Sequence, residues 1–373
     1  MRLLILSLAC ILGCSDPEPE PQPEPGEFDA FDREVETFLA DNGLAGATAF
    51  IVTKDEGVVH MRGYGAFDVD RVMFLASSSK ILSVGILMRL ADQGLIDIDE
   101  PISDYLGDWG MYKTNITVAQ MLSNSSGMVG ILDDPMYGPY LCMFLDGNTL
   151  LECGEAIYTA DDTADLIPPD TEFHYGGGQW QLAGAIAEVV SGKSWAELFA
   201  ETYGQPCALT SSGFYNPIAR NITEAGVDGA RLYPTWFNGD PASLGPAPNP
   251  SIEGGAYANA ADYAQILWMH LREGTCGDAR VLSAEAVARM QEDRIGEVYG
   301  GKSLDPTMPG YGMGWFRDRT RHVVGDPGAW GAMPWLDVDR GYGAMFIIED
   351  EAVVGVQMRL AIQPVIEEII DAR

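Results

Sequence analysis

The strand-like segments of this 373-residue chain lie at its two ends, and helical patterns dominate the middle. Near the first end, residues 47–55 and 56–65 have the pattern of a hairpin that turns at Asp55–Gly57. From Tyr311 onward, apolar segments separated by glycine-rich turns predict further strands. One sheet that joins both ends, interrupted by a mostly helical insertion at roughly 95–255, explains this distribution most simply. The predicted C-terminal strands are residues 310–316, 321–325, 341–350 and 352–360.

Apolar residues at helical spacing predict the helices, and the strongest pattern is Ser77–Gly94, which ends at a glycine typical of a C-cap. We therefore expect one α+β domain over residues 27–372, a three-layer α/β/α arrangement with an antiparallel sheet flanked by helices. The helices are predicted at 27–42, 77–94, 117–123, 180–191, 194–203, 260–273, 283–291 and 364–372.

The N-terminal residues are predicted to be a targeting segment. Arg2 precedes a short apolar run, too short to span a bilayer, that ends in ILGC and resembles a bacterial lipobox. On this interpretation, residues 1–13 are a lipoprotein signal peptide and Cys14 is lipidated; ordinary secretory cleavage nearby is the alternative. Residues 14–26 alternate Pro and Glu, which predicts an extended acidic tether. Ser15 indicates, by analogy, the outer membrane.

The net charge of −33, from 55 acidic and 22 basic residues, disfavours two classes of partner. Such a surface repels nucleic acid and anionic lipid, so we expect no nucleic-acid partner and membrane contact only through the lipid anchor. The histidines are scattered, and neither C-x-x-C nor H-E-x-x-H occurs. We therefore expect neither a metal nor a cofactor.

Four cysteines follow the tether, an even number that permits two disulfides in an exported protein. Three pairings are possible. Because Cys142 and Cys153 flank one loop-like segment, we favour Cys142–Cys153 and Cys207–Cys276.

The stretch FLASSSKIL, residues 74–82, contains the candidate nucleophile. Ser77 and Lys80 are three residues apart and would share one face of a helix. A serine hydroxyl needs a neighbouring base, and a lysine with a depressed pKa can serve. The alternative for Ser77 is a simple helix N-cap, and Ser78 and Ser79 lack the spacing to Lys80.

The sequence around this pair resembles the serine β-lactamase and penicillin-binding-protein superfamily, in particular its class C β-lactamase-like branch of esterases and D-amino-acid peptidases. Members of that branch begin a helix with S-x-x-K and continue with further motifs in a fixed order. The resemblance covers the whole predicted domain. The matching segments are FLASSSKILSVGILMRLADQGLIDIDEPISDYL (74–106), ITVAQMLSNSSGM (116–128), TEFHYGGGQWQLAGAIAEVVSGKSW (171–195), SIEGGAYANAADYAQIL (251–267), YGMGW (311–315) and GDPGAWGAMPWLD (325–337).

The resemblance implies a role for several residues. Ser77 would be the nucleophile, Lys80 its general-base partner, and Tyr175 the phenol that relays the serine proton to the leaving group. The oxyanion hole would combine the backbone N–H groups of Ser77 and of Ala329, on the strand after the third motif. Trp330 and Trp335 would line the acyl pocket, unless they only pack the core.

Three departures from the family pattern weaken this assignment. The second motif usually has Asn where this chain has Gly177, so an amide that would hold Lys80 is missing, although Gln179 is a substitute in reach. The third motif is usually Lys-Thr-Gly or His-x-Gly, whereas this chain has Asp326, Pro327 and Gly328. Asp326 should raise the pKa of Tyr175 and repel a substrate carboxylate. Asn124 replaces a frequent histidine at a position that we interpret as structural.

The sequence therefore predicts an exported, outer-membrane-anchored serine hydrolase that forms an acyl-enzyme at Ser77. Its substrate would be a small ester or amide or a peptide, with esterase activity favoured over D-amino-acid peptidase and β-lactamase activity. Gly177, Asp326, Gly328 and Trp330 are the candidate pocket residues. The alternative is a catalytically inactive binding or scaffolding lipoprotein on the same fold.

Overall fold

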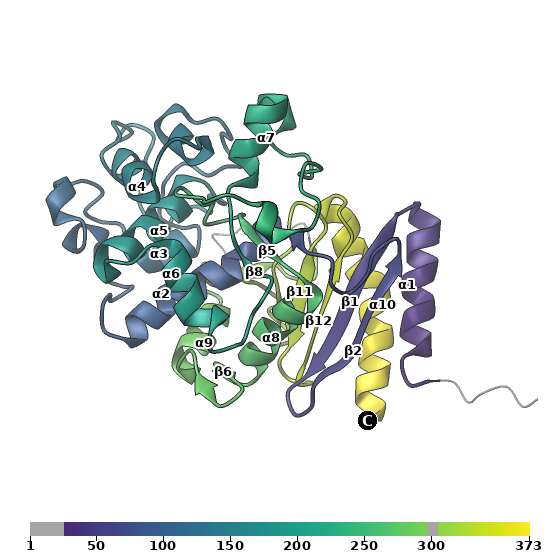
Figure 1. Ribbon diagram of the computed structural model, residues 1–373. Helices are drawn as coiled ribbons and strands as arrows, with labels where there is room; N and C mark the ends of the chain where they lie inside the picture. Colours follow the sequence, from purple (N-terminus) through teal and green to yellow (C-terminus); the bar gives the residue numbers. More distant parts are fainter. Residues whose placement is uncertain (1–25, 297–304) are drawn as a thin grey trace, which may run out of the picture.

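The computed structural model describes residues 26–296 and 305–373, so the predicted signal peptide, Cys14 and almost all of the tether lie outside the described residues. A seven-stranded antiparallel sheet is the centre of the fold (Figure 1). The N-terminal hairpin joins the C-terminal strands through the pairing of β1 with β12, in which Thr48 faces Ile347. The expected sheet from both chain ends is confirmed. Its order is β2 (Gly57–Gly65), β1 (Gly46–Thr53), β12 (Tyr342–Ile347), β11 (Met333–Asp337), β10 (Val323–Gly325), β9 (Phe316–Arg317) and β8 (Gly310–Tyr311).

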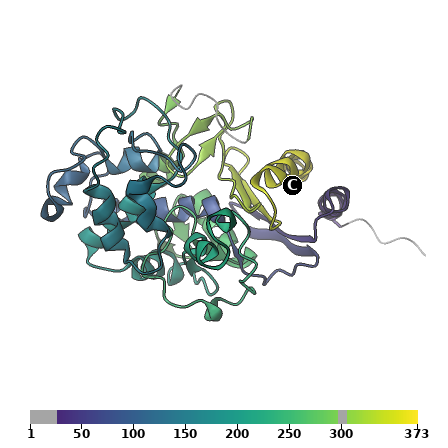
Figure 2. The same cartoon turned by 90° about the horizontal axis from the view of Figure 1, so that it is seen from above.

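Helices cover both faces of this sheet, as expected for three layers. The helices α1 (Asp29–Asn42) and α10 (Ala352–Ala372) pack on one face, and α8 (Ala260–Leu271) packs on the other (Figure 2). Strand β1 is buried on both sides, because Phe50 belongs to the apolar core on the α8 side and Ile51 to the core under α1 and α10.

The helical insertion lies beyond α8. The helices predicted at 117–123, 180–191 and 194–203 are present, whereas the helices Leu150–Tyr158 and Pro217–Ala225 were not predicted. A three-stranded sheet was not predicted; it joins β3 (Met73–Phe74), β5 (Ala256–Ala258) and β4 (Gly213–Phe214) and so closes the insertion near its two ends. The remaining helices longer than one turn are α2 (Lys80–Asp92), α3 (Val118–Leu122), α4 (Leu150–Tyr158), α5 (Gly178–Ser191), α6 (Trp195–Phe199), α7 (Pro217–Ala225) and α9 (Ala284–Gln291).

The prediction of a strand at 352–360 is wrong, because these residues form the first turns of α10. The β-branched residues Val353, Val354 and Val356 favour a strand by propensity. The buried positions of α10, however, recur every three to four residues, at Val356, Arg359 and Gln363, and this packed face determines the structure. Strand β11 was missed among the predicted strands.

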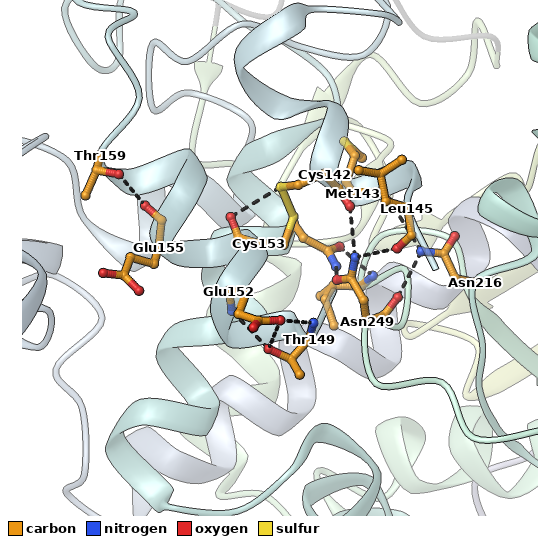
Figure 3. The surroundings of a disulfide bond; sticks show 12 residues. Cys142, Met143, Leu145, Thr149, Glu152, Cys153, Glu155, Thr159, Asn216 and Asn249 are labelled. Atoms are coloured by element: carbon orange, nitrogen blue, oxygen red, sulfur yellow. Dashed lines mark hydrogen bonds between the residues drawn. A yellow bond between two sulfur atoms is a disulfide. The ribbon is translucent and has the colours of Figure 1, made fainter. Parts of the chain in front are cut away.

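Both predicted disulfides are confirmed, as Cys142–Cys153 and Cys207–Cys276. The first one closes a loop that two asparagines hold against the rest of the insertion (Figure 3). Asn249 donates to the carbonyls of Cys142 and Leu145, and Asn216 donates to the carbonyls of Met143 and Asn249. The disulfide loop therefore fixes the chain just before residue 253. Among the described residues, no helix has both the length and the hydropathy needed to cross a membrane.

Candidate active site

The Ser77 turn, residues 75–80, leads from β3 into α2 by way of the short 3₁₀ helix η1 (Ala76–Ser79). Ala76 has φ +46°, which is unusual for a residue with a side chain and forces a sharp change of direction before Ser77. Ser77 is half-buried, whereas Ser78 and Ser79 are fully buried. Of the three consecutive serines, Ser77 alone is therefore accessible to a substrate.

The other two serines anchor this turn, which goes beyond the small polar filler that the sequence suggests. Ser78 Oγ donates to the carbonyl of Asp326 over 2.6 Å, and Ser79 Oγ donates to the carbonyl of Ala76. The N–H of Ala256 donates to Ser79 Oγ over 2.8 Å. Ser78 and Ser79 thus bind the turn to the third-motif loop and to β5.

Lys80 is fully buried at the start of α2, directly below the Ser77 turn. Its ammonium Nζ donates to the carbonyl of Glu253 over 3.1 Å, and within the described residues this bond, rather than one to Ser77, is the hydrogen bond that it makes. Nζ also lies 4.5 Å from the ring centroid of Tyr175 and 5.3 Å from that of Trp180. Lys80 therefore lies beneath an aromatic ring, in a favourable cation–π position.

Tyr175 is the side chain that reaches Ser77. The side chain of Ser77 interacts with the phenol and lowers its pKa, against the larger effect of burial, so the two side chains are neighbours. The Tyr175 ring stacks on Phe316, with centroids 6.0 Å apart, and the carbonyl of Tyr175 accepts from the N–H of Ile131 over 2.9 Å. The side chain of the neighbouring His174 binds Asp133 instead. A phenol thus lies next to an accessible serine hydroxyl.

The second motif has no amide that reaches Lys80 within the described part of the chain. Gln179 donates to the carbonyls of His174 and Gly176 and accepts from Ser126, so its side chain is occupied within the loop. Asn124 Oδ1 accepts from Gly176 N–H and from Trp180 Nε1–H, which makes it the structural residue that the sequence analysis expects.

Glu253 is the site residue that the sequence analysis missed. Its carboxylate Oε2 lies 3.8 Å from Lys80 Nζ and accepts from the N–H of Gly177 over 3.0 Å. The side chain is buried. A signal was present in the sequence, since an acidic residue directly precedes Gly254–Gly255 in the matching segment 251–267. The lysine of the site thus has a carboxyl partner.

The third-motif loop, residues 326–330, packs directly on the Ser77 turn. A Cβ atom on Gly328 would lie 2.1 Å from the carbonyl oxygen of Leu75, so only glycine permits this approach. Asp326 is fully buried, and neither of its carboxyl oxygens has a hydrogen-bond partner among the described residues. Ala329 is exposed in the turn between β10 and β11, which corrects the expectation that it lies on a strand. The turn forms because Gly328 N–H donates to the carbonyl of Ala332.

Comparison with known proteins decides the family. The family model described as Beta-lactamase matches residues 31–359. The chain belongs to this family of serine hydrolases. Penicillin-binding protein 4 of Amycolatopsis lactamdurans is 28% identical over 274 residues, 69% of this chain and 66% of that protein. The teichoic acid D-alanine hydrolase of Staphylococcus aureus is 24% identical over 194 residues, 49% of this chain and 44% of that protein. Both matches span less than two thirds of the relative's own length.

Solved structures of β-lactamase-family proteins share the fold. A putative β-lactamase from Bacteroides dorei has a TM-score of 0.71 and 23% identity, with 92% of this chain and 99% of that chain covered. EstCE1, a hydrolase with promiscuous acyltransferase activity, has a TM-score of 0.70 and 20% identity, with 90% and 98% covered. A family VIII carboxylesterase has a TM-score of 0.66 and 18% identity, with 91% and 98% covered. These likenesses confirm the α+β fold.

Burial dominates the electrostatics of this β-lactamase-family site. Burial lowers the pKa of Lys80, against the opposing effect of Glu253, and raises the pKa of Glu253, against the opposing effect of Lys80. Burial also raises the pKa of Tyr175, and the nearby Asp326 raises that pKa further, as predicted. The pKa of Asp326 itself is raised well above 3.8 by burial. The site therefore favours an uncharged Asp326.

Asp326 gives a prediction about stability. Because the pKa of Asp326 is raised in the folded protein, the unfolded chain releases this proton first as pH rises, and folded stability falls through that range. An asparagine side chain at this position cannot ionise. We expect the Tm of Asp326→Asn to match that of the wild type near pH 4 and to exceed it by several degrees at pH 8, as measured by differential scanning calorimetry. Asp108→Asn, at an exposed position, is the control. If the Tm of both variants changed with pH in the same way, the raised pKa of Asp326 would be contradicted.

The other candidates lie in packed surroundings. Trp330 packs in an aromatic cluster with Phe74 and donates its indole N–H to the carbonyl of Arg231, which favours the packing alternative over a pocket role. Trp335 lies in the core and donates to Tyr342.

Proposed function

We propose that this protein is a serine hydrolase that forms an acyl-enzyme at Ser77 and hydrolyses small esters. The observation that carries the proposal is the grouping of the accessible Ser77 beside Tyr175, whose ring lies over the buried Lys80, in a member of the β-lactamase family. A carboxylesterase and a putative β-lactamase are both among its structural neighbours, so the preference for an ester rests on the charge of the third motif.

In this mechanism, Tyr175 accepts the proton of Ser77 Oγ while that oxygen bonds to the acyl carbon, and it passes its own proton to the leaving-group oxygen. Lys80 stabilises the negative charge that develops on the phenol oxygen during this relay, because its ammonium lies under the ring. The acyl oxygen becomes an oxyanion and accepts from the backbone N–H groups of Ser77 and Ala329. Ser77 belongs to the first turn of η1, where N–H groups lack partners within the helix. Water then attacks the acyl-enzyme by the reverse proton path, releasing the acid.

The charge of the third motif supports a preference among substrates. Asp326 stands where the family places a cation, so a substrate carboxylate finds no positive partner at this position and meets repulsion once Asp326 ionises.

This preference predicts a ranking within a matched series of p-nitrophenyl esters. We expect the butyryl ester to exceed the succinyl ester in kcat/KM by about tenfold or more, because like charges brought together cost several kcal/mol. The kcat/KM of the 4-aminobutyryl ester should be no lower than that of the butyryl ester. The butyryl-to-succinyl ratio should grow from pH 6 to pH 9 and stay flat in Asp326→Asn. A preference for the succinyl ester, or rapid nitrocefin hydrolysis, would contradict this ranking.

An inactive binding protein on the same fold is the alternative that Gly177 and Asp326 suggest. The contact between Ser77 and Tyr175 argues against it, because an inactive site has no need to keep the two side chains together. Labelling with a fluorophosphonate probe tests the choice. Attachment of the probe to the peptide that contains Ser77 is expected, and the absence of label from the folded wild-type protein would refute the hydrolase.

We further propose that the protein is exported and anchored to the outer membrane through a lipid on Cys14. The two disulfides and the cell-wall-associated relatives support export. The lipid anchor rests on the sequence pattern of residues 11–14.

A further inference from the structure

The backbone at Gly177 excludes the asparagine that the family has at this position. Gly177 has φ +84° and ψ −155°, a conformation that is open essentially to glycine alone. A Cβ atom there would also lie 3.1 Å from the backbone N of Ile131 and from the carbonyl oxygen of Val129. The missing amide is therefore a consequence of a rebuilt turn, and single substitution of Gly177 cannot restore it.

Glu253 occupies the space that this glycine turn leaves open. A Cβ atom on Gly176 would lie 2.4 Å from Glu253 Oε2, so the carboxylate fits only because residue 176 is glycine. The same oxygen accepts from Gly177 N–H over 3.0 Å and lies 3.8 Å from Lys80 Nζ. The two glycines and the glutamate thus form one unit around the lysine.

The segment that carries Glu253 is held rigidly by the neighbouring helices. Gln181 on α5 donates to Asn249 and to the carbonyl of Pro250, and it accepts from the N–H of Ile252. Ser83 on α2 donates to the carbonyl of Ile252 over 2.6 Å. Since Lys80 and Ser83 lie on the same helix, the glutamate and the lysine are fixed relative to each other.

We propose that Glu253 is a positioning residue that takes the place of the family's second-motif asparagine and keeps the Lys80 ammonium charged beneath Tyr175. The proposal rests on the proposed hydrolase function. An amide can accept a hydrogen bond from the lysine but has no charge to oppose the loss of the lysine proton that burial favours. A carboxylate both holds the lysine and favours its charged form. With the third-motif cation replaced by Asp326, this ion pair maintains the positive charge that the phenol needs.

Among the described residues, two other titratable groups approach the pair of Lys80 and Glu253. Tyr175 approaches Lys80 from the second motif, and Asp326 approaches it from the third-motif loop. Both carboxyls favour the lysine cation, and burial raises the pKa of each of them. Glu253 is the carboxyl that combines the ion-pair distance to Lys80 with a backbone donor, so its loss should dominate the change in the proton affinity of Lys80.

The test is the pH profile of Glu253→Gln, which keeps the size of the side chain and an oxygen for Gly177 N–H but removes the charge. Lys80 should then lose its proton at lower pH. We expect the alkaline limb of kcat to move down by about one pH unit or more, as for loss of an opposite charge within 4–6 Å. On the alkaline side of the wild-type limb, kcat should fall about tenfold while KM changes by less than about threefold.

Two further variants make the outcome decisive. Glu188→Gln removes another partly buried carboxyl that accepts from a backbone N–H, that of Trp195, and its profile should equal that of the wild type. Gly176→Ala displaces the Glu253 carboxylate and should reproduce the shift of Glu253→Gln. An unchanged profile in a folded Glu253→Gln that still reacts with the fluorophosphonate probe, or a shift of the acidic limb instead, would overturn the role of Glu253. Failure of the wild-type protein to react with the probe would instead refute the hydrolase function itself.

Discussion

We expect Ser77→Ala to lose both fluorophosphonate labelling and ester hydrolysis, with kcat/KM lowered by at least about 10³-fold. The alanine keeps the φ and ψ angles of η1 and removes one oxygen atom, so the turn that Ser78 and Ser79 anchor should persist. Neither neighbouring serine can take over, because Ser78 and Ser79 are fully buried and hydrogen-bonded to other groups. Mass spectrometry of the labelled protein and initial rates with p-nitrophenyl butyrate measure the two effects.

The neighbouring serine supplies the matched control for this variant. Ser78→Ala removes the hydrogen bond to the carbonyl of Asp326 and should slow the enzyme, yet its Ser77 should still take the label. Equal labelling of Ser77→Ala and wild type would show that the probe reacts elsewhere. It would also restore the inactive binding protein as the better interpretation of the site.

Much of the fold was predictable because its signals are local and periodic. The hairpin at the first chain end and the helix after Ser77 show clear apolar spacing, and the order of the motifs fixes how they come together. Strand and helix become ambiguous where β-branched residues meet a short apolar run, as at Val353 and Val354 at the start of α10. The packing of one face of α10 against the sheet decides between helix and strand there. The propensities of single residues carry no information about that packing.

The site residues that belong to a family motif could be predicted from the sequence. The residue that compensates for a departure from a motif could not. Ser77, Lys80 and Tyr175 are found from spacing and resemblance, and the structure brings them together. Glu253 was missed because its partner Lys80 is 173 positions away in the sequence. In addition, Gly177 indicates only that the asparagine amide of the second motif is missing. In three dimensions Glu253 contacts the glycine turn at Gly176 and Gly177, so we interpret the glutamate and the two glycines as one coupled departure from the family pattern.

Tyr175→Phe is the second variant with a large expected effect, because Tyr175 is the group in contact with the Ser77 hydroxyl. Removing a positioned proton-transfer group costs roughly 10²–10⁴-fold in rate. We expect kcat for p-nitrophenyl butyrate to fall within that range, while KM changes by less than about threefold. The phenyl ring can keep its stacking on Phe316 and its place over Lys80, so folding should be little affected.

The direction of the pKa shifts separates this role from a structural one. Burial and Asp326 hold the pKa of Tyr175 above 10, so the phenol is neutral in the resting enzyme and exchanges protons only as Ser77 attacks. In Tyr175→Phe, the remaining activity should therefore rise steadily with pH, as hydroxide replaces the missing relay. Tyr257→Phe, another partly buried phenol, which packs on Phe74 beside the Ser77 turn, should keep the wild-type profile. If Tyr175→Phe retained both the wild-type kcat and the wild-type pH profile, Lys80 would have to take the serine proton directly, and Tyr175 would only orient the nucleophile.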